Sequence, residues 1–333
     1  MRNLLTDIAG VSVGHVTDLA LGSGVTAVLF DRPAIASASV LGGAPGGRDT
    51  TLMEPEMTVE RVDGIALSGG SAFGLDAAGG LQAWFRDIGR GTLIGTALIP
   101  IVPQAIIFDL LNGGNKEWGR FSPYREMGWA AAEAASSGDF ALGTVGAGTG
   151  ATTATVKGGL GSASMVTPEG YRVAALVVVN AVGNPLIGDG PHFWSAPFEL
   201  NGEFGDRGYP PFPLSPDAYA PRLKGQRSAT PETGTTIGVV VTDAPLTKPQ
   251  AKRLAIAAQD GLARAVLAVH LPFDGDTMFA ASTGEGPAVG ADILSQLCHE
   301  ATIVTARAIA RGVYEAAALP YPDAQADWKA RFT

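Results

Sequence analysis

Short apolar runs rich in β-branched residues alternate along the chain with longer stretches whose apolar residues recur at helical spacing. Runs of the first kind predict buried strands, and stretches of the second kind predict amphipathic helices. The predicted strands are residues 25–30, 64–69, 152–156, 171–180 and 235–243, and the predicted helices are residues 71–88, 124–137, 247–269 and about 288–317. The 45 glycines cluster in loops between these runs, where they let backbones turn sharply and pack closely. Together these features predict a densely layered α/β protein.

Residues 190–233 interrupt this pattern. They hold eight of the 22 prolines and show almost no periodicity. A loop of this length inside a compact domain is uncommon and is usually functional or a linker. It ends at Gly234, where Thr235 opens an apolar strand. Two interpretations stay open here: a plain loop-to-strand junction, or an exposed site at which the chain is cut.

Composition excludes several classes of protein. The 333 residues, 46% of them hydrophobic, suffice for two domains or one large α/β unit. The single cysteine, Cys298, excludes a disulfide framework and a cysteine-based zinc site, and the four scattered histidines do not suggest a metal site. A net charge of −9 argues against a nucleic-acid partner. We therefore expect neither metal nor cofactor.

The sequence shows neither a signal-peptide pattern nor a membrane-spanning pattern. The first 18 residues lack the continuous apolar stretch and cleavage pattern of a signal peptide. The most apolar stretch, residues 93–111, contains Pro100, Pro103, Gln104 and Asp109, whereas a membrane-spanning helix needs about 20 clean apolar residues. We expect a cytoplasmic protein without a membrane partner.

Two familiar glycine motifs do not fit their usual context. GAGTGA at 146–151 matches a loose dinucleotide-binding pattern, but the β-branched residues that follow do not predict the helix that would hold a pyrophosphate. LSGGSAFG at 67–74 resembles a nucleophile elbow, but Phe73 occupies the position where the motif needs glycine. Ser71 is more simply interpreted as the N-cap of the next helix.

Other polar residues are ambiguous when each is taken alone. Asp274 and Asp276, in DGDT, form what is most often a polar turn. Lys157 follows a β-branched run and precedes two glycines, so it is either a solvated lysine or a positioned cation. Asn180 closes the apolar run AALVVVN, where its amide is either a turn-former or a preorganised hydrogen-bond donor.

The order of five segments is more specific than any one of them. The segments are FDLLNGG, GAGTGATTATVKGGLGSAS, LVVVNAVGNP, TGTTIGVVVTDAPLTKPQAKRLA and FDGDTMFAAST. In this order they resemble the DmpA-type aminopeptidases and the nylon-oligomer hydrolases. The resemblance begins at GVSVGH, residues 10–15, and covers nearly the whole chain, with GTTIGVVVTDA and its downstream helix as the most specific part.

The resemblance implies a fold and a processing event. The implied fold is a layered αββα sandwich of the kind shared with ornithine acetyltransferase, similar to the N-terminal-nucleophile hydrolases. The chain would cut itself between Gly234 and Thr235 into an α subunit, residues 1–234, and a β subunit, residues 235–333. The two subunits would stay associated and assemble into a homo-oligomer of processed αβ units.

The resemblance also implies which residues form the site. Thr235 would be the nucleophile, and Lys157, Asn180, Asp274 and Asp276 would support catalysis. Two positions differ among family members. Gly234 matches the aminopeptidase branch, because the nylon-oligomer branch has asparagine before the cut. Phe108 stands where some members have a tyrosine that helps the oxyanion site.

The chemistry of a threonine explains why cleavage would be needed. A threonine hydroxyl is a poor nucleophile without a base. A free α-amine, with a pKa of about 7.7–8.0, is such a base, whereas a peptide nitrogen is not basic. We expect Lys157 to lower the pKa of the Thr235 amine by like-charge repulsion, Asp274 and Asp276 to orient Thr235, and Asn180 to donate to the oxyanion. Gly234 would tolerate a strained scissile bond.

The sequence therefore predicts a self-cleaving amide hydrolase. Its substrate would be a small peptide or amide, cut either by an aminopeptidase acting on short peptides or by an amidase acting on ω-amino-acid oligomers. Two alternatives remain: an acyltransferase that uses the same threonine, and an unprocessed binding or scaffold protein in which TGTT only begins a strand.

Overall fold

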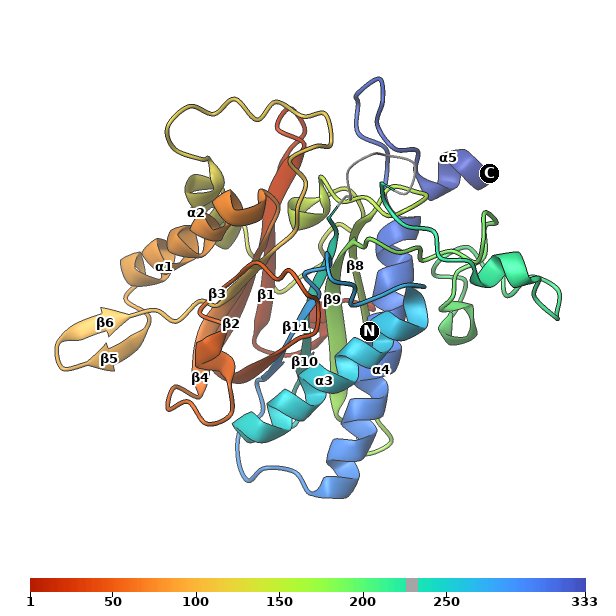
Figure 1. The fold of residues 1–333 in the computed structure, drawn as a ribbon. Helices are drawn as coiled ribbons and strands as arrows, with labels where there is room; N and C mark the ends of the chain where they lie inside the picture. Colours follow the sequence, from red (N-terminus) through yellow and green to blue (C-terminus); the bar gives the residue numbers. More distant parts are fainter. Residues whose placement is uncertain (226–232) are drawn as a thin grey trace.

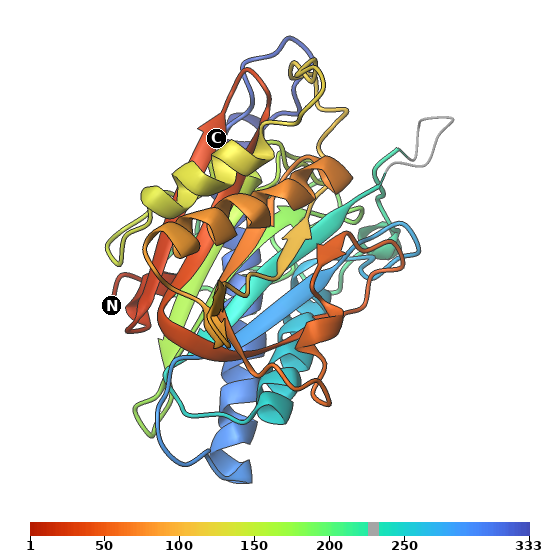
Figure 2. The same ribbon diagram turned by 90° about the vertical axis from the view of Figure 1, so that its left-hand side faces the viewer.

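The computed structural model describes residues 1–225 and 233–333 (Figures 1 and 2). Its main sheet has the strand order β3–β7–β4–β2–β11–β10–β9–β8, and β1 pairs with β2. These strands are β1 (Val11–Asp18), β2 (Ser23–Val40), β3 (Gly47–Arg48), β4 (Arg61–Ser68), β7 (Gln104–Ile106), β8 (Gly159–Val166), β9 (Arg172–Asn180), β10 (Thr235–Thr242) and β11 (Thr277–Ser282). The helices are α1 (Ala77–Asp87), α2 (Tyr124–Glu133), α3 (Lys248–Ala265), α4 (Ala291–Tyr314) and α5 (Trp328–Phe332).

The sheet forms two stacked layers, and the long strand β2 belongs to both of them. Its register with β4 shifts between Leu29 and Ala34; β1 pairs with the residues before the shift, and β11 pairs with the residues after it. Apolar side chains of β1, β2 and β4 meet those of β9, β10 and β11 in one buried cluster between the layers, to which β10 contributes Ile237, Val239 and Val241. Alternate residues of a strand point to opposite faces, so Val240 faces the other way.

Helices cover the outer face of each β layer (Figure 1). α1 and α2 pack on β1, β2 and β4 through a cluster that includes Leu81 and Phe85. α3 and α4 pack on the layer formed by β8 to β11. The predicted αββα sandwich is therefore confirmed. The start of α3 is confirmed too, because Thr247 Oγ1 accepts a hydrogen bond from the Gln250 amide and proline lies in the first turn.

Two local predictions were wrong. Residues 152–156 do not form a strand, and only an isolated bridge joins Thr152 to Lys157. The strand is instead the next segment, β8, which the sequence pattern did not indicate because the segment contains glycines. A side chain on Gly161 would lie 1.9 Å from the Ala308 carbonyl oxygen, so the glycine is needed for the close packing of α4. Ser71 makes no N-cap hydrogen bond; it begins a short 3-10 helix with a φ of 52°.

The apolar stretch at residues 93–111 forms short strands. Part of it makes the hairpin of β5 (Thr92–Ile94) and β6 (Ala97–Ile99), which projects from the body in Figure 1, and part makes β7. In the described part of the chain, no helix is both long enough and apolar enough to cross a membrane.

Residues 190–225 of the proline-rich loop are mostly irregular, as predicted, yet they are packed. Phe193 and Phe204 are buried, and Phe193 stacks on Trp328 of α5 with ring centroids 5.9 Å apart. Arg222 forms ion pairs with Asp189 and Asp217. The last part of the loop, residues 226–232, lies outside the described residues.

Candidate active site

Thr235 is the first residue of β10, in the middle of the sheet. It pairs with Asn180, the last residue of β9, and it is only 4% exposed. Gly234, directly before it, forms a parallel bridge with Asp274. Three segments that are far apart in the sequence therefore meet at the start of β10: Gly234–Thr235, Asn180 and Asp274.

The segment 273–276 holds the predicted cleavage site by backbone hydrogen bonds. The Gly234 amide donates to the Phe273 carbonyl at 3.3 Å, and the Gly275 amide donates to the Gly234 carbonyl at 3.1 Å. The Thr235 hydroxyl also donates to the Gly234 carbonyl oxygen. The hydroxyl therefore lies against the carbonyl group of the bond that would be cut, and a fixed amide donor polarises the same carbonyl.

Two glycines are required by this close approach. A side chain on Gly234 would lie 2.4 Å from the backbone nitrogen of Val182, and one on Gly275 would lie 2.7 Å from Thr235 Oγ1. Gly234 is not among the glycines with positive φ, so it does not serve the strained backbone that the sequence suggested. Its role is to leave room for the backbone that follows β9.

The two aspartates are buried and orient the surrounding backbone. Asp274 accepts from the amides of Val182 at 3.2 Å and Leu271 at 3.0 Å. Burial, and then the nearby Asp276 carboxylate, raise the pKa of Asp274 to about 6. Asp276 accepts from the Thr236 amide at 2.7 Å. The pair forms part of the frame around Thr235 rather than an exposed polar turn.

His270 also belongs to this frame, although the sequence gave no reason to select it. Its amide donates to Asp276 Oδ2 at 3.0 Å, and its ring nitrogen Nδ1 lies 2.9 Å from the same oxygen. A lone histidine in a loop, six residues from the aspartate that it contacts, carries no spacing signal. Only the fold of the loop brings the two together.

The Asn180 side chain has a defined orientation. Its oxygen Oδ1 accepts from the Thr152 amide at 3.0 Å and from Lys224 Nζ at 2.9 Å. Its nitrogen Nδ2 donates to the Phe108 carbonyl at 3.1 Å. Because the donors around Oδ1 fix the amide, the NH₂ group is held in the direction of Phe108. A fixed NH₂ group on the residue that pairs with Thr235 across the sheet is suited to donate to a developing oxyanion.

Lys157 is fully buried and its ammonium group is saturated by the backbone. Nζ donates to the carbonyls of Gly148 at 3.2 Å, Ala151 at 2.7 Å and Gly158 at 2.8 Å. Burial lowers the pKa of Lys157 to about 7; Asp109 opposes this effect, and the Lys224 charge adds to it. These hydrogen bonds include neither Gly234 nor Thr235.

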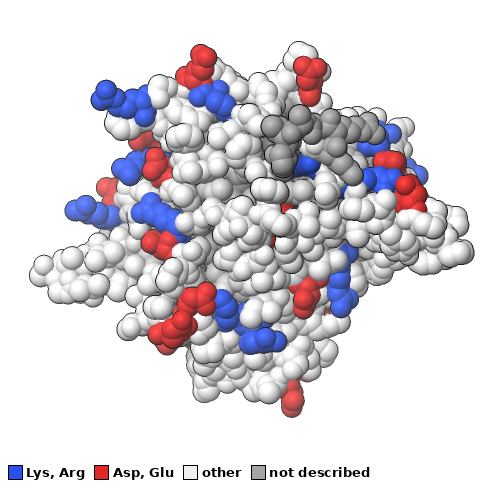
Figure 3. Space-filling view, viewed as in Figure 1, with Lys and Arg blue, Asp and Glu red and all other residues white. Residues whose placement is uncertain are grey.

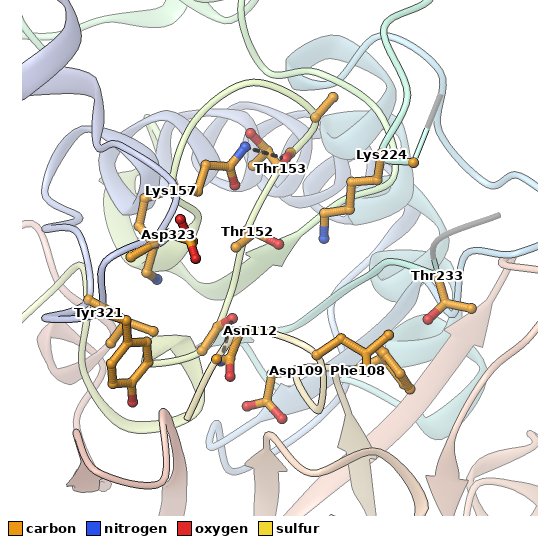
Figure 4. Close-up of a pocket in the computed structure, with 18 of the residues that line it drawn as sticks. Phe108, Asp109, Asn112, Thr152, Thr153, Lys157, Lys224, Thr233, Tyr321 and Asp323 are labelled. Carbon is orange, nitrogen blue, oxygen red and sulfur yellow. Dashed lines mark hydrogen bonds between the residues drawn. The ribbon is translucent and has the colours of Figure 1, made fainter. Parts of the chain in front are cut away.

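A cavity of about 920 Å³ lies beside these residues (Figure 4). Its lining includes Phe108, Lys157, Lys224, Thr233 and Asp323. In Figure 4, Lys157 and Lys224 lie on opposite sides of Thr152, and Thr233 lies on the side of Lys224. The C-terminal segment 319–325 supplies one wall of the cavity. A cavity of this size accommodates a small molecule.

A buried aspartate, Asp109, lies in the cavity wall. Asp109 accepts from Ser23 Oγ at 2.6 Å and from the Gly70 amide at 2.7 Å, and burial raises its pKa. Tyr124 donates to the same Ser23 hydroxyl at 2.9 Å. Across the described ranges, no group of three or more His, Cys, Asp and Glu side chains is arranged to hold a metal ion.

Comparison with known proteins supports a common origin for these features. The model of peptidase family S58 matches residues 3–326. An uncharacterized aminopeptidase of Mycobacterium leprae (strain TN) is 40% identical over 319 residues, which are 91% of this chain and 85% of that protein. A 6-aminohexanoate-oligomer endohydrolase of Kocuria sp. (strain KY2) is 28% identical over 85% of this chain and 76% of its own length.

Solved structures share the fold. A Burkholderia sp. beta-aminopeptidase matches with a TM-score of 0.73 and 23% identity, over 99% of this chain and 92% of that one. An L-aminopeptidase D-Ala-esterase/amidase from Ochrobactrum anthropi matches with a TM-score of 0.70 and 20% identity, over 96% of this chain and 88% of that one, and its structure is described as a variant of the Ntn hydrolase fold.

Proposed function

The chain belongs to peptidase family S58 and is a hydrolase of the aminopeptidase and amidase type, and we propose that it cuts itself between Gly234 and Thr235 and then uses Thr235 as an N-terminal nucleophile. One arrangement carries this proposal. The Thr235 hydroxyl contacts the Gly234 carbonyl oxygen, and the Gly275 amide donates to that same oxygen at 3.1 Å. A nucleophile and an oxyanion donor therefore converge on one peptide bond.

The cleavage step that fits this geometry is an acyl shift from nitrogen to oxygen. Thr235 Oγ attacks the Gly234 carbonyl carbon and loses its proton, while the Gly275 amide stabilises the negative charge on the carbonyl oxygen. The carbon–nitrogen bond then breaks, and the Thr235 nitrogen gains a proton and becomes a free amine. Water hydrolyses the resulting ester, which leaves the Gly234 carboxylate and restores the Thr235 hydroxyl.

The new amine makes Thr235 a catalyst. It accepts the proton of its own hydroxyl as Oγ attacks the carbonyl carbon of a substrate amide, and it returns the proton to the leaving nitrogen. Water then hydrolyses the acyl-threonine ester and releases the acid. The Asn180 NH₂ group stabilises the oxyanion in both steps, and Asp276 holds the strand at Thr236, at 2.7 Å from that amide. No cofactor takes part.

The substrate class follows from the cavity and from the relatives. We propose a small amide with a free amino group, either a short peptide or an oligomer of ω-amino acids, because the relatives are named aminopeptidase and 6-aminohexanoate-oligomer endohydrolase. The cavity of about 920 Å³ holds a few residues of such a chain. A screen of amino-acid p-nitroanilides, β-peptides and aminohexanoate dimers separates these substrates.

The proposed subunits, residues 1–234 and 235–333, would form one sandwich because β10 and β11 lie between β9 and β2. The exposed hairpin of β5 and β6 supports further assembly into a homo-oligomer. Leu93 is 67% exposed and Ile94 is 63% exposed. In Figure 3 the hairpin projects without a charged side chain at its tip. Exposed apolar side chains on a protruding hairpin are typical of a protein interface.

Intact-mass spectrometry of the purified protein tests the proposal. We expect two masses, those of residues 1–234 and 235–333, and a single uncut chain of 34.0 kDa for Thr235→Ala. A second fragment that begins at any residue other than Thr235 would contradict the assignment of the nucleophile. An uncut wild-type protein that hydrolyses none of the amides in the screen would contradict the proposed function as a whole.

A further inference from the structure

Two buried lysines line the cavity, but their surroundings differ. The three hydrogen bonds of Lys157 all go to backbone carbonyls of residues 148–158. Lys224 Nζ instead donates to both oxygens of Asn180, at 3.0 Å to the backbone oxygen and 2.9 Å to Oδ1. Asn180 is the residue that pairs with Thr235 across the sheet. Of these two lysines, Lys224 is therefore the one whose ammonium group contacts a residue of the predicted site.

The backbone oxygen of Asn180 connects Lys224 to the cleavage site. A side chain on Gly234 would lie 2.8 Å from this oxygen, so the Gly234 Cα carbon is next to it. One carbonyl group thus separates the Lys224 ammonium from the bond that would be cut. The Lys224 amide donates to the Val182 carbonyl at 2.9 Å, which fixes the lysine on the same turn that faces Gly234.

The charge of Lys224 also reaches other groups of the site. It lowers the pKa of Lys157, and it opposes the rise in the pKa of Asp274. Lys224 is itself only 9% exposed, so water screens its charge weakly. A charge of this kind acts strongly on any titratable group that appears at Thr235.

We propose that Lys224 is the positioning residue for Thr235 and Asn180, and that it has the role the sequence suggested for Lys157. The inference rests on the proposed function. After cleavage the Thr235 amine lies beside the Lys224 ammonium, and like-charge repulsion keeps the amine neutral and able to accept a proton. The contact with Oδ1 also turns the Asn180 NH₂ group away from Lys224, into the direction of an oxyanion donor.

A series of variants at Lys224 separates charge from hydrogen bonding. Lys224→Met removes both, Lys224→Gln keeps donors without the charge, and Lys224→Arg keeps the charge. The measurement is kcat/KM against pH for the processed enzyme, because its acid limb reports the pKa of the base. Lys157→Met is the matched comparison, since it also removes one buried lysine from the cavity wall.

We expect the acid limb of the Met and Gln variants to move to higher pH by about one to two units, and kcat to fall at least tenfold at pH 7 with a smaller change in KM. The limb should stay in place for Lys224→Arg and Lys157→Met. Uncut Lys224→Gln protein with the thermal midpoint of uncut Thr235→Ala would show that Lys224 is needed for cleavage, a step that has no free amine, and would contradict the role proposed for its charge.

Two results with the processed enzyme would also overturn the inference. One is an acid limb of Lys224→Met and Lys224→Gln at the wild-type pH, and the other is an equally large shift in Lys157→Met. Both are distinct from failure of the proposed function, which would show in the wild-type protein as an uncut chain without amide hydrolysis.

Discussion

The amide of Gly275 donates to the carbonyl oxygen of Gly234 at 3.1 Å, and the side-chain position that Gly275 leaves empty is 2.7 Å from Thr235 Oγ1. One glycine therefore supplies a hydrogen-bond donor to the bond that would be cut and makes room for the hydroxyl that would attack it. Asp274 and Asp276 flank this glycine and fix its position through backbone amides on neighbouring loops and strands. Residues 274–276 therefore act as one structural unit.

Substitution of Gly275 by alanine tests this arrangement. The new methyl group would lie 2.7 Å from Thr235 Oγ1 and 3.1 Å from Thr235 Cγ2, so the threonine side chain must rotate or shift. We expect cleavage to slow by at least 100-fold, because a small displacement of a reacting group costs that much. Time-resolved denaturing gels measure the rate.

Gly290→Ala is the control for the glycine substitution. Gly290 has a negative φ and no atom near the position of an added side chain, so its substitution should leave cleavage unchanged. Normal cleavage of Gly275→Ala would show that Thr235 does not need this space.

Substitutions of Thr235 test whether this residue is the nucleophile in cleavage and in amide hydrolysis. Thr235→Ala lacks the hydroxyl and should neither be cut nor hydrolyse amides. Thr235→Ser keeps the hydroxyl and the future amine but loses the methyl group that restricts χ1, so it should be cut and active at a reduced rate. Intact masses and amide turnover are measured on the same preparations. A cut and active alanine variant would mean that another residue is the nucleophile.

The sequence predicted the layers well because strong apolar periodicity determines which faces are buried. It also selected Thr235, Asn180, Asp274 and Asp276, which the fold brings together, although the chemistry of these residues stays a prediction. It did so through the order of motifs, since each residue alone has an ordinary structural interpretation. The strand β8 was missed because glycines that serve helix packing do not look like strand residues.

No local sequence pattern identifies Lys224 as a residue of the site. It lies in an irregular, proline-rich segment with no periodicity, and its contact with Asn180 spans 44 residues of sequence. Lys157 had the better local signal, a lysine between a β-branched run and two glycines. The backbone carbonyls around Lys157 explain that signal, because a glycine-rich turn exposes carbonyl groups to one central cation.

The β5–β6 hairpin gives a prediction about assembly. The double substitution Leu93→Asp and Ile94→Asp places two charges on the exposed apolar tip, and burial of unpaired charges in an interface is costly. We expect light scattering to show a lower mass than for the wild-type protein, with cleavage unchanged. Leu200→Asp, at an exposed apolar residue of the proline-rich loop, is the control. An unchanged mass for the hairpin variant would exclude the hairpin from the interface.

The buried Lys157 makes folding stability depend on pH, with a sign that follows from its lowered pKa. Between about pH 7 and pH 10.5 the unfolded chain keeps a proton on this amine, whereas the folded protein has lost it. The unfolded state then binds more protons, so the free energy of unfolding rises with pH, by up to about 1.4 kcal/mol per pH unit. Below pH 7 both states are protonated and this dependence disappears.

Urea unfolding of the uncut Thr235→Ala chain measures this effect without interference from subunit dissociation. We expect its free energy of unfolding to rise between pH 7.5 and pH 9.5 more steeply than that of Thr235→Ala/Lys157→Met. Arginine stays protonated throughout this range, so Thr235→Ala/Lys157→Arg should lose the same part of the slope and be less stable than the lysine protein at high pH. Equal slopes in all three proteins would show that the folded protein keeps Lys157 charged, and that its three carbonyl contacts outweigh the cost of burial.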